Sequence, residues 1–257
     1  MSGIAPPPRY HTLMLEFRQE TLGGLPCIVA EAPDTSHQKL AMIVMHGFGA
    51  TGEDLVPLAE EIVHRDTSLA DSVKFIFPAA PLEPEEMSDY GGRAWWPIDI
   101  AKLQRAMMLG DFRDLREDLP ELLPAARKHV LDIIEEVRAE KGWGLDHFVL
   151  GGFSQGSMLA TDVALRLPEP PAGLVIWSGT LLCENHWKPL MPNRAGLRVI
   201  QSHGRQDQIL PFVAAEWLRD ALSAAGLKVE FLPFNGPHTI AQPAIDATVR
   251  LLADLTR

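Results

Sequence analysis

The chain has 257 residues, of which 46% are hydrophobic and 22% are charged, an ordinary composition for a globular protein. Its formal net charge of −11 argues against nucleic acid and anionic lipid surfaces as partners, but it suits a neutral substrate. No apolar run approaches the roughly 20 residues of a membrane span. The N-terminal residues also lack the pattern of a secretory signal, so we expect a cytoplasmic protein without stable membrane insertion.

The predicted elements alternate between short apolar runs and amphipathic helical patterns. This alternation predicts a mostly parallel sheet with helices on both faces, preceded by an antiparallel hairpin at one edge. In chain order we expect the edge hairpin (11–17 and 25–32), strand 40–47, helix 52–65, strand 73–81 and a long helix candidate over 111–141 that is broken or restarted near Pro120 and Pro124. After it we expect strand 147–153, helix 154–167, strands 172–179 and 197–204, helix 211–226, strand 228–234 and a final helix near 240–256.

The two cysteines, Cys27 and Cys183, form no CxxC pair and have no metal-ligand spacing. We therefore expect two buried free thiols. Neither a metal nor a cofactor is expected.

The pentapeptide of residues 152–156, GFSQG, fits the pattern G-x-S-x-G, with a predicted strand before it and a predicted helix after it. In such a turn the serine takes a strained backbone conformation, and glycine at the flanking positions avoids a collision. The serine oxygen would stand at the C-terminal edge of the sheet, above a helix N-terminus that favours negative charge. Ser154 is therefore the candidate nucleophile; the alternative is a helix N-cap between packing glycines.

A serine hydroxyl needs a general base, and the base needs an acidic group that orients it. In folds of this kind the chain order is serine, acid, histidine. His238 lies in a loop between the last strand and the final helix and is the candidate base; a surface or capping histidine is the alternative. Asp207 lies in the loop after the preceding strand and is the candidate acid; the alternative is an aspartate that only stabilises the next helix N-terminus. We assign His203 a structural role and His186, in an irregular loop, at most a place beside the pocket.

Acyl chemistry also needs hydrogen-bond donors for the tetrahedral oxyanion. One donor should be the backbone amide of the residue after the nucleophile, Gln155, and the other should come from a loop after an early strand. The run His46-Gly47-Phe48-Gly49 is such a loop, and Phe48 is the candidate for the second amide. His46 is expected to brace this loop.

Six segments follow one another along the chain: MHGFGATGEDLVPLAEEI, FIFPAAP, GGRAWWPID, GGFSQGSMLA, SHGRQDQILP and GPHTI. In sequence and in order they resemble the phospholipase/carboxylesterase group of α/β-hydrolases, which includes bacterial carboxylesterases and acyl-protein thioesterases. The resemblance implies the α/β-hydrolase fold, one domain over 1–257, the triad Ser154, Asp207 and His238, and the oxyanion donors Phe48 and Gln155, which are the residues chosen above. The chain departs from the family at position 157, where a serine stands in place of the usual glycine.

Residues 81–93 are rich in proline, glycine and acidic residues, which indicates a surface excursion within the domain. This excursion, at about 81–112, is expected to cover the active site around Trp95 and Trp96. Core packing is the alternative role for the two tryptophans of this excursion. The candidate pocket residues lie on segments that should reach the C-terminal edge of the sheet, where ligands bind in such folds. They are Phe48, Trp95, Trp96, Ile98, Leu181 and Leu182.

The sequence thus predicts a serine carboxylesterase that hydrolyses small to medium acyl esters through an acyl-enzyme intermediate. An acyl-protein thioesterase or lysophospholipase-like hydrolase is the alternative within the fold, and a peptidase or an acyltransferase is a further one. A non-catalytic binding module on the same fold is an alternative of another class. The expected partner is a small-molecule ester or thioester, and a homodimer is left open.

Overall fold

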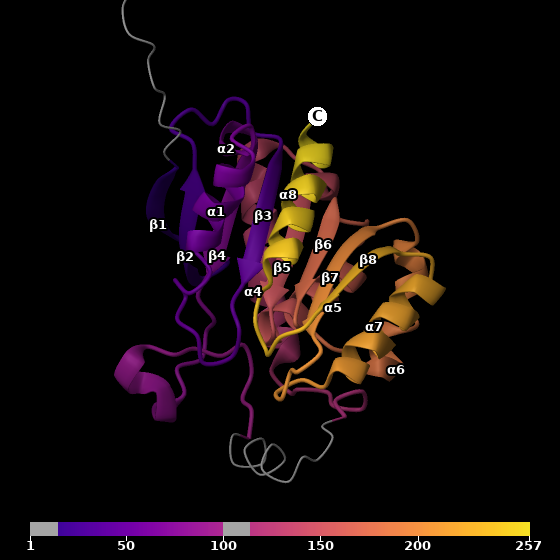
Figure 1. Cartoon of the computed structure of the whole chain (residues 1–257). Helices are drawn as coiled ribbons and strands as arrows, with labels where there is room; N and C mark the ends of the chain where they lie inside the picture. The colour runs from indigo at the N-terminus through magenta and orange to yellow at the C-terminus, as the bar shows by residue number, and fades with distance from the viewer. Residues whose placement is uncertain (1–14, 100–113) are drawn as a thin grey trace, which may run out of the picture.

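The computed structural model describes residues 15–99 and 114–257 (Figure 1). Its eight strands form one sheet in the order β1-β2-β4-β3-β5-β6-β7-β8. Strands β3 to β8 are parallel to one another, and the β1–β2 hairpin joins β4 in antiparallel orientation at one edge. This is the α/β-hydrolase fold that the sequence predicts. The strands are β1 (Glu16–Leu22), β2 (Leu25–Glu31), β3 (Leu40–Met45), β4 (Val73–Pro78), β5 (Phe148–Phe153), β6 (Gly173–Trp177), β7 (Arg198–Gly204) and β8 (Lys228–Phe234).

Helices cover both faces of this sheet (Figure 1). Helices α1, α2 and α8 pack on one face, and α4, α5 and α7 pack on the other. The described helices are α1 (Pro57–Arg65), α2 (Leu69–Ser72), α4 (Leu123–Lys141), α5 (Gln155–Arg166), α6 (Glu184–Trp187), α7 (Phe212–Ala224) and α8 (Gln242–Thr256), with short 3-10 turns at Glu85–Tyr90, Leu145–His147 and Met191–Arg194.

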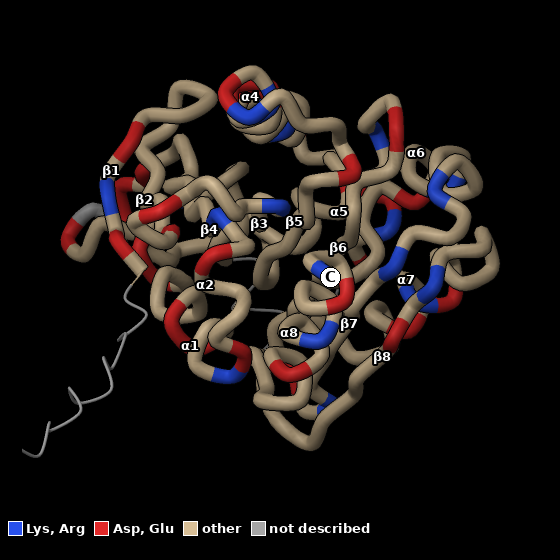
Figure 2. The backbone as a smooth tube through the Cα atoms, turned by 90° about the horizontal axis from the view of Figure 1, so that it is seen from above, with Lys and Arg blue, Asp and Glu red and all other residues tan. Residues whose placement is uncertain are grey.

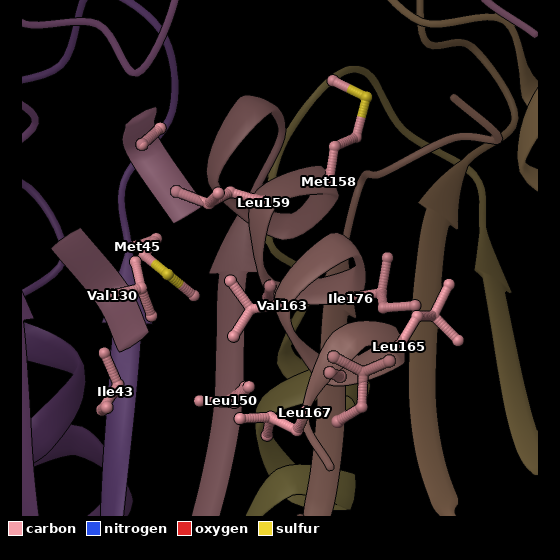
Figure 3. Packing of buried hydrophobic residues seen from close by; sticks show 14 of the residues in the cluster. Ile43, Met45, Val130, Leu150, Met158, Leu159, Val163, Leu165, Leu167 and Ile176 are labelled. Atoms are coloured by element: carbon pink, nitrogen blue, oxygen red, sulfur yellow. The ribbon is translucent and has the colours of Figure 1, made fainter. Parts of the chain in front are cut away.

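The central strands are apolar on both sides because both faces are covered. In β3, Ile43 and Met45 point into the cluster beneath α4 and α5, whereas Met42 and Val44 point into the cluster beneath α1 and α8. Figure 3 shows the first cluster, in which side chains of α5 pack with those of α4, β3 and β5. Residues 155–165 of α5 are all buried. The helix that follows the G-x-S-x-G turn is therefore held rigidly by the core.

The edge hairpin exists as predicted, but its first strand is Glu16–Leu22 and not 11–17. The two strands are joined by Gly23 and Gly24, whose φ values are 58° and 74°. A two-residue turn with positive φ at both positions matches the twist of a hairpin and pairs the residues on either side of it. The turn therefore sets where the strand lies. Residues 11–14 of the predicted strand lie outside the described part of the chain.

Prolines stand at the starts of two helices. Helix α1 begins at Pro57, later than the predicted residue 52. Helix α4 begins at Leu123, beside Pro124, near which the sequence predicts that the helix breaks or restarts. Proline is favoured in the first helical turn because its missing N–H is not needed there. His186 lies in the short helix α6 and not in an irregular loop. Residues 100–112 of the predicted excursion lie outside the described residues.

Acidic and basic residues are interspersed over the outer helices, with both signs on α4 (Figure 2). Within residues 15–99 and 114–257 there is no helix long and apolar enough to span a bilayer. The prediction for the cysteines is confirmed: Cys27 and Cys183 are both free and buried. Burial raises the pKa of each thiol to about 12, so neither is an activated nucleophile.

Candidate active site

Ser154 stands between the end of β5 and the start of α5 with φ 53° and ψ −120°. A non-glycine residue at positive φ is strained and persists only where its surroundings hold it. A Cβ atom added to Gly156 would lie 2.1 Å from the carbonyl oxygen of Met45, and one added to Gly152 would lie 2.6 Å from the same oxygen. The flanking glycines are therefore required because the turn is pressed against the end of β3.

Hydrogen bonds hold both the amide and the carbonyl group of the strained residue. The backbone amide of Ser154 donates to the carbonyl oxygen of Trp177 at the end of β6, with 2.9 Å between the two atoms. The hydroxyl of Ser157 donates to the carbonyl oxygen of Ser154 at 2.7 Å. Position 157 is usually a glycine in the family that the sequence resembles. The serine found here therefore adds a contact that fixes the turn.

Asp207 and His238 are brought together from loops after β7 and β8. Nδ1 of His238 lies 2.6 Å from Oδ2 of Asp207. The other carboxylate oxygen, Oδ1, accepts the backbone amides of Ile209 and Leu210 at 2.9 and 2.8 Å. Nε2 of His203 lies 3.2 Å from Oδ2. The Asp207 side chain is thus fully enclosed and hydrogen-bonded at both oxygens.

This environment controls the ionisation of Asp207. Burial by itself raises the pKa of the carboxyl group, but hydrogen bonds from His203, His238 and the Leu210 amide outweigh burial and hold the pKa well below its usual range. Asp207 is therefore ionised at neutral pH. An ionised carboxylate at Nδ1 of His238 leaves Nε2 of that ring as the atom able to accept a proton.

The two loops are stacked on each other. The backbone amide of Gln206 donates to the carbonyl oxygen of Gly236 at 3.0 Å. A Cβ added to Gly204 would lie 2.4 Å from that same oxygen, so only glycine permits the approach. Ser178, at the end of β6, donates from its hydroxyl to the carbonyl oxygen of Thr239 at 3.0 Å. These contacts fix the backbone on both sides of His238.

The imidazole of His238 lies beside the serine turn. Its ring centroid is 4.7 Å from that of Phe153, the residue before Ser154. The His238 side chain is 11% exposed, and Ser154 is half-buried. The three residues predicted as a triad therefore come from the carboxyl ends of β5, β7 and β8 to one end of the sheet.

The loop after β3 runs alongside this turn. A Cβ added to Gly47 would lie 3.5 Å from the Cβ of Ser154, so the peptide that leads into Phe48 is adjacent to the candidate nucleophile. Gly49, at φ 79°, donates its amide to the carbonyl oxygen of Arg93 at 2.8 Å, and Arg93 donates its amide to Ala50 at 2.9 Å. The predicted excursion is thereby paired to the loop. Gln155 is the first residue of α5, so its amide has no partner within the helix.

Most of the predicted pocket residues are packed in the hydrophobic core. Trp95 and Trp96 are buried at 0% and 4% exposure, Leu181 and Leu182 are also buried, and Ile98 packs against the same cluster. Phe48 is half-buried. Two surface hollows, of about 670 and 490 Å³, are lined by other residues. The pocket assignment stays a prediction.

Two polar side chains at the site have roles that the sequence reasoning missed. His203 contacts Asp207 directly, and the side chain of Gln155 hydrogen-bonds the backbone of Trp95 and Trp96. The four-residue spacing of His203 and Asp207 across a strand end was the available signal for the first. No local pattern marks the second, because its partners lie about 60 residues away.

Comparison with known proteins identifies the family of this chain. The profile of the phospholipase/carboxylesterase family matches residues 25–252. The chain belongs to the phospholipase/carboxylesterase family. It is therefore a hydrolase of the esterase and thioesterase type.

Similar proteins align with most of the length of this chain. The chain is 29% identical over 212 residues to "Acyl-protein thioesterase 1" of Eremothecium gossypii, a match that covers 81% of this chain and 84% of the relative. Esterase PE8 has a similar structure, with a TM-score of 0.71 at 24% identity over 94% of this chain and 99% of that one. The carboxylesterase from Mesorhizobium loti has a TM-score of 0.69 at 20% identity, over 92% and 98% of the two chains. At these identities the structural matches support the fold.

Proposed function

We propose that this protein is a serine carboxylesterase that hydrolyses small to medium acyl esters through an acyl-enzyme intermediate. The observation that carries the proposal is the 2.6 Å contact between His238 and the ionised Asp207, beside a serine held at positive φ. Family membership supports the class of reaction.

In the first half of the proposed reaction, Oγ of Ser154 attacks the carbonyl carbon of the ester while Nε2 of His238 takes the hydroxyl proton. The carbonyl oxygen becomes an oxyanion that accepts hydrogen bonds from the amides of Phe48 and Gln155. The tetrahedral intermediate then breaks its bond to the leaving oxygen. His238 returns the proton to that oxygen, the alcohol departs and the acyl group remains on Ser154.

In the second half, water attacks the acyl-enzyme while His238 takes a proton from the water. The intermediate collapses, the proton returns to Oγ of Ser154 and the carboxylic acid is released. Asp207 stays ionised throughout and stabilises the imidazolium that forms in each half.

We further propose that the chain is one domain and that its excursion, at about 81–112, covers the acyl site. The pairing of Arg93 with Gly49 and Ala50 supports this placement, since it ties the described part of the excursion to the loop that carries Phe48. No charged cluster in the sequence indicates a handle for a charged substrate, which favours a neutral acyl group.

A thioester is the second candidate substrate, favoured by relatives named acyl-protein thioesterase 1. The same residues would serve, because the thiolate leaving group departs from the same tetrahedral intermediate. A matched ester and thioester of one acyl chain separates the two candidates through the ratio of their kcat/KM values.

The test of the nucleophile is labelling by a fluorophosphonate probe, which reacts with an activated serine. Wild-type protein should be labelled and should hydrolyse a short p-nitrophenyl ester, whereas Ser154→Ala should do neither. Ser157→Ala is the matched control, since it removes a neighbouring hydroxyl and should still be labelled. Equal labelling of wild type and Ser154→Ala would reject Ser154, and an inert wild type would favour a binding module.

A series of p-nitrophenyl esters of increasing acyl length tests the proposed substrate size. We expect kcat/KM to peak at short or medium chains. A steady rise to long chains would instead favour the lysophospholipase-like alternative.

A further inference from the structure

The ring of His46 makes two hydrogen bonds of opposite sense. Nε2 lies 3.0 Å from the backbone nitrogen of Ala80, and Nδ1 lies 2.8 Å from the carbonyl oxygen of Gly47. An amide can only donate and a carbonyl can only accept, so Nε2 accepts from Ala80 and Nδ1–H donates to Gly47. Burial lowers the pKa of His46, which agrees with a neutral ring that carries its one hydrogen on Nδ1.

The bond to Gly47 orients the amide of Phe48. The carbonyl of Gly47 and the N–H of Phe48 belong to one planar trans peptide, in which the two groups point in opposite directions. A donor that fixes the carbonyl oxygen therefore also fixes where the N–H points. This is the peptide that runs beside Ser154.

A second set of bonds starts from the residue that carries the other proposed oxyanion donor. The side-chain oxygen of Gln155 accepts the backbone amide of Trp95, and its side-chain nitrogen donates to the carbonyl oxygen of Trp96, both at 2.9 Å. The indole Nε1–H of Trp95 then donates to the carbonyl oxygen of His46, also at 2.9 Å. Gln155, Trp95 and His46 are at most 2% exposed.

These bonds form a continuous path from the residue that bears one proposed oxyanion amide to the peptide that bears the other. Buried polar groups need partners in any protein, so the bonds alone would fit a purely structural role. The residues at the two ends of this path indicate a catalytic purpose as well, because they carry the two proposed oxyanion amides. Catalysis by an oxyanion hole depends on donors that are held in place before the reaction.

We propose that His46, Trp95 and Gln155 are positioning residues that hold the amides of Phe48 and Gln155 at a fixed separation for the oxyanion. The inference rests on the proposed function, because it assigns a purpose to those two amides. It predicts that loss of a link lowers kcat and leaves KM nearly unchanged, since the oxyanion exists only beyond the ground state.

His46 offers a matched pair of substitutions. In His46→Asn the side-chain amide nitrogen can replace Nδ1, which keeps the bond to Gly47 and loses the one to Ala80. In His46→Gln the side-chain oxygen can replace Nε2, which keeps the bond to Ala80 and loses the one to Gly47. We expect kcat for a short p-nitrophenyl ester to fall on the order of 100-fold in His46→Gln and less than about 10-fold in His46→Asn.

Trp95 offers a second test that is independent of His46. Trp95→Phe removes the indole donor to His46. Trp187→Phe is the control, because Trp187 is equally buried and its indole likewise makes one hydrogen bond, to Asp162 at 2.9 Å. Both variants should unfold at a lower temperature than wild type, but only Trp95→Phe should lose kcat, by roughly 10-fold or more.

The outcomes separate this inference from the proposed function. If wild type hydrolyses the ester, but His46→Gln equals or exceeds His46→Asn and the two tryptophan variants have equal kcat, the positioning role is rejected and the esterase stands. If wild type neither hydrolyses esters nor reacts with the fluorophosphonate, both proposals fall. Should the His46 variants not fold, the comparison of Trp95→Phe with Trp187→Phe decides.

Discussion

Nε2 of His203 lies 3.2 Å from the same oxygen of Asp207 that accepts the 2.6 Å hydrogen bond from His238. The same nitrogen lies 2.8 Å from the carbonyl oxygen of Leu210, which can only accept, so Nε2 carries the hydrogen. Among the described residues the buried Nδ1 of His203 has no hydrogen-bond partner. His203 thus presents its donor to the carboxylate and to the loop that carries it.

Replacing His203 should therefore weaken the site through Asp207. His203→Leu removes the donor, and since hydrogen bonds to charged groups contribute about 1.5–3 kcal/mol, kcat/KM should fall roughly 10- to 100-fold. His203→Gln can place an amide donor near the position of Nε2 and should stay within a few-fold of wild type. Ester hydrolysis by the two variants checks this, and equal rates would assign His203 to packing alone.

Asp207→Asn should abolish most activity without changing the shape of the side chain. The amide of asparagine can present a donor to Nδ1 of His238 and so favour the wrong ring tautomer. In a serine triad this change lowers kcat by on the order of 10,000-fold. Asp220→Asn, on the exposed side of α7, is the control and should be as active as wild type. A loss of less than about 10-fold in Asp207→Asn would remove Asp207 from the proposed mechanism.

The lowered pKa of Asp207 also predicts how stability depends on pH. The carboxyl group has a reference pKa of 3.8 when unfolded and a lower one when folded, so the unfolded state binds the proton more readily. The stabilisation is therefore fully present above the unfolded pKa and is lost as pH falls below about 3.8 toward the folded pKa, by at most about 1.4 kcal/mol per pH unit. This stabilisation is measured as the difference in the free energy of unfolding between wild type and Asp207→Asn, from urea unfolding between pH 3 and 7.

We expect the wild-type advantage over Asp207→Asn to be constant from about pH 5 to 7 and to shrink below pH 4. An advantage that grows as the pH falls would contradict the hydrogen-bonded environment described for this carboxylate.

Gly156→Ala should damage both stability and activity. The added Cβ would meet the carbonyl oxygens of Met45 and His46 at 2.1 and 2.5 Å, and neither backbone can move without displacing the turn. We expect a loss of about 3 kcal/mol in unfolding free energy and a fall in kcat on the order of 100-fold. Thermal unfolding and ester hydrolysis measure the two effects.

Gly144→Ala is the matched control for Gly156→Ala. Its new Cβ would meet only the side-chain carboxylate of Asp146, which can rotate away, and the backbone there has φ −78°. It should remain close to wild type in both measurements. If Gly156→Ala did so too, the turn would be less tightly packed against β3 than described.

The positions of the central strands could be predicted because each is a continuous apolar run between polar or glycine-rich breaks. The last strand was predicted with its observed bounds, 228–234. The start of α1 is less predictable, since apolar spacing continues through the turn before Pro57. The start of α4 could be predicted because proline marks it, beside Pro124. The apolar pattern predicts the first strand at 11–17, earlier than its observed bounds Glu16–Leu22, because its position depends on the turn at Gly23 and Gly24.

Local chemistry along the chain was enough to name Ser154, Asp207 and His238 as the candidate triad, because a strand-to-helix turn with glycines and the order of the loops can be read residue by residue. Only the tertiary structure decided which groups surround them. His203 reaches Asp207 across the end of β7, and Gln155 reaches a segment about 60 residues away. Such contacts form because the sheet brings loops from distant parts of the chain together at one end. No local pattern of residues specifies which distant residues will meet there.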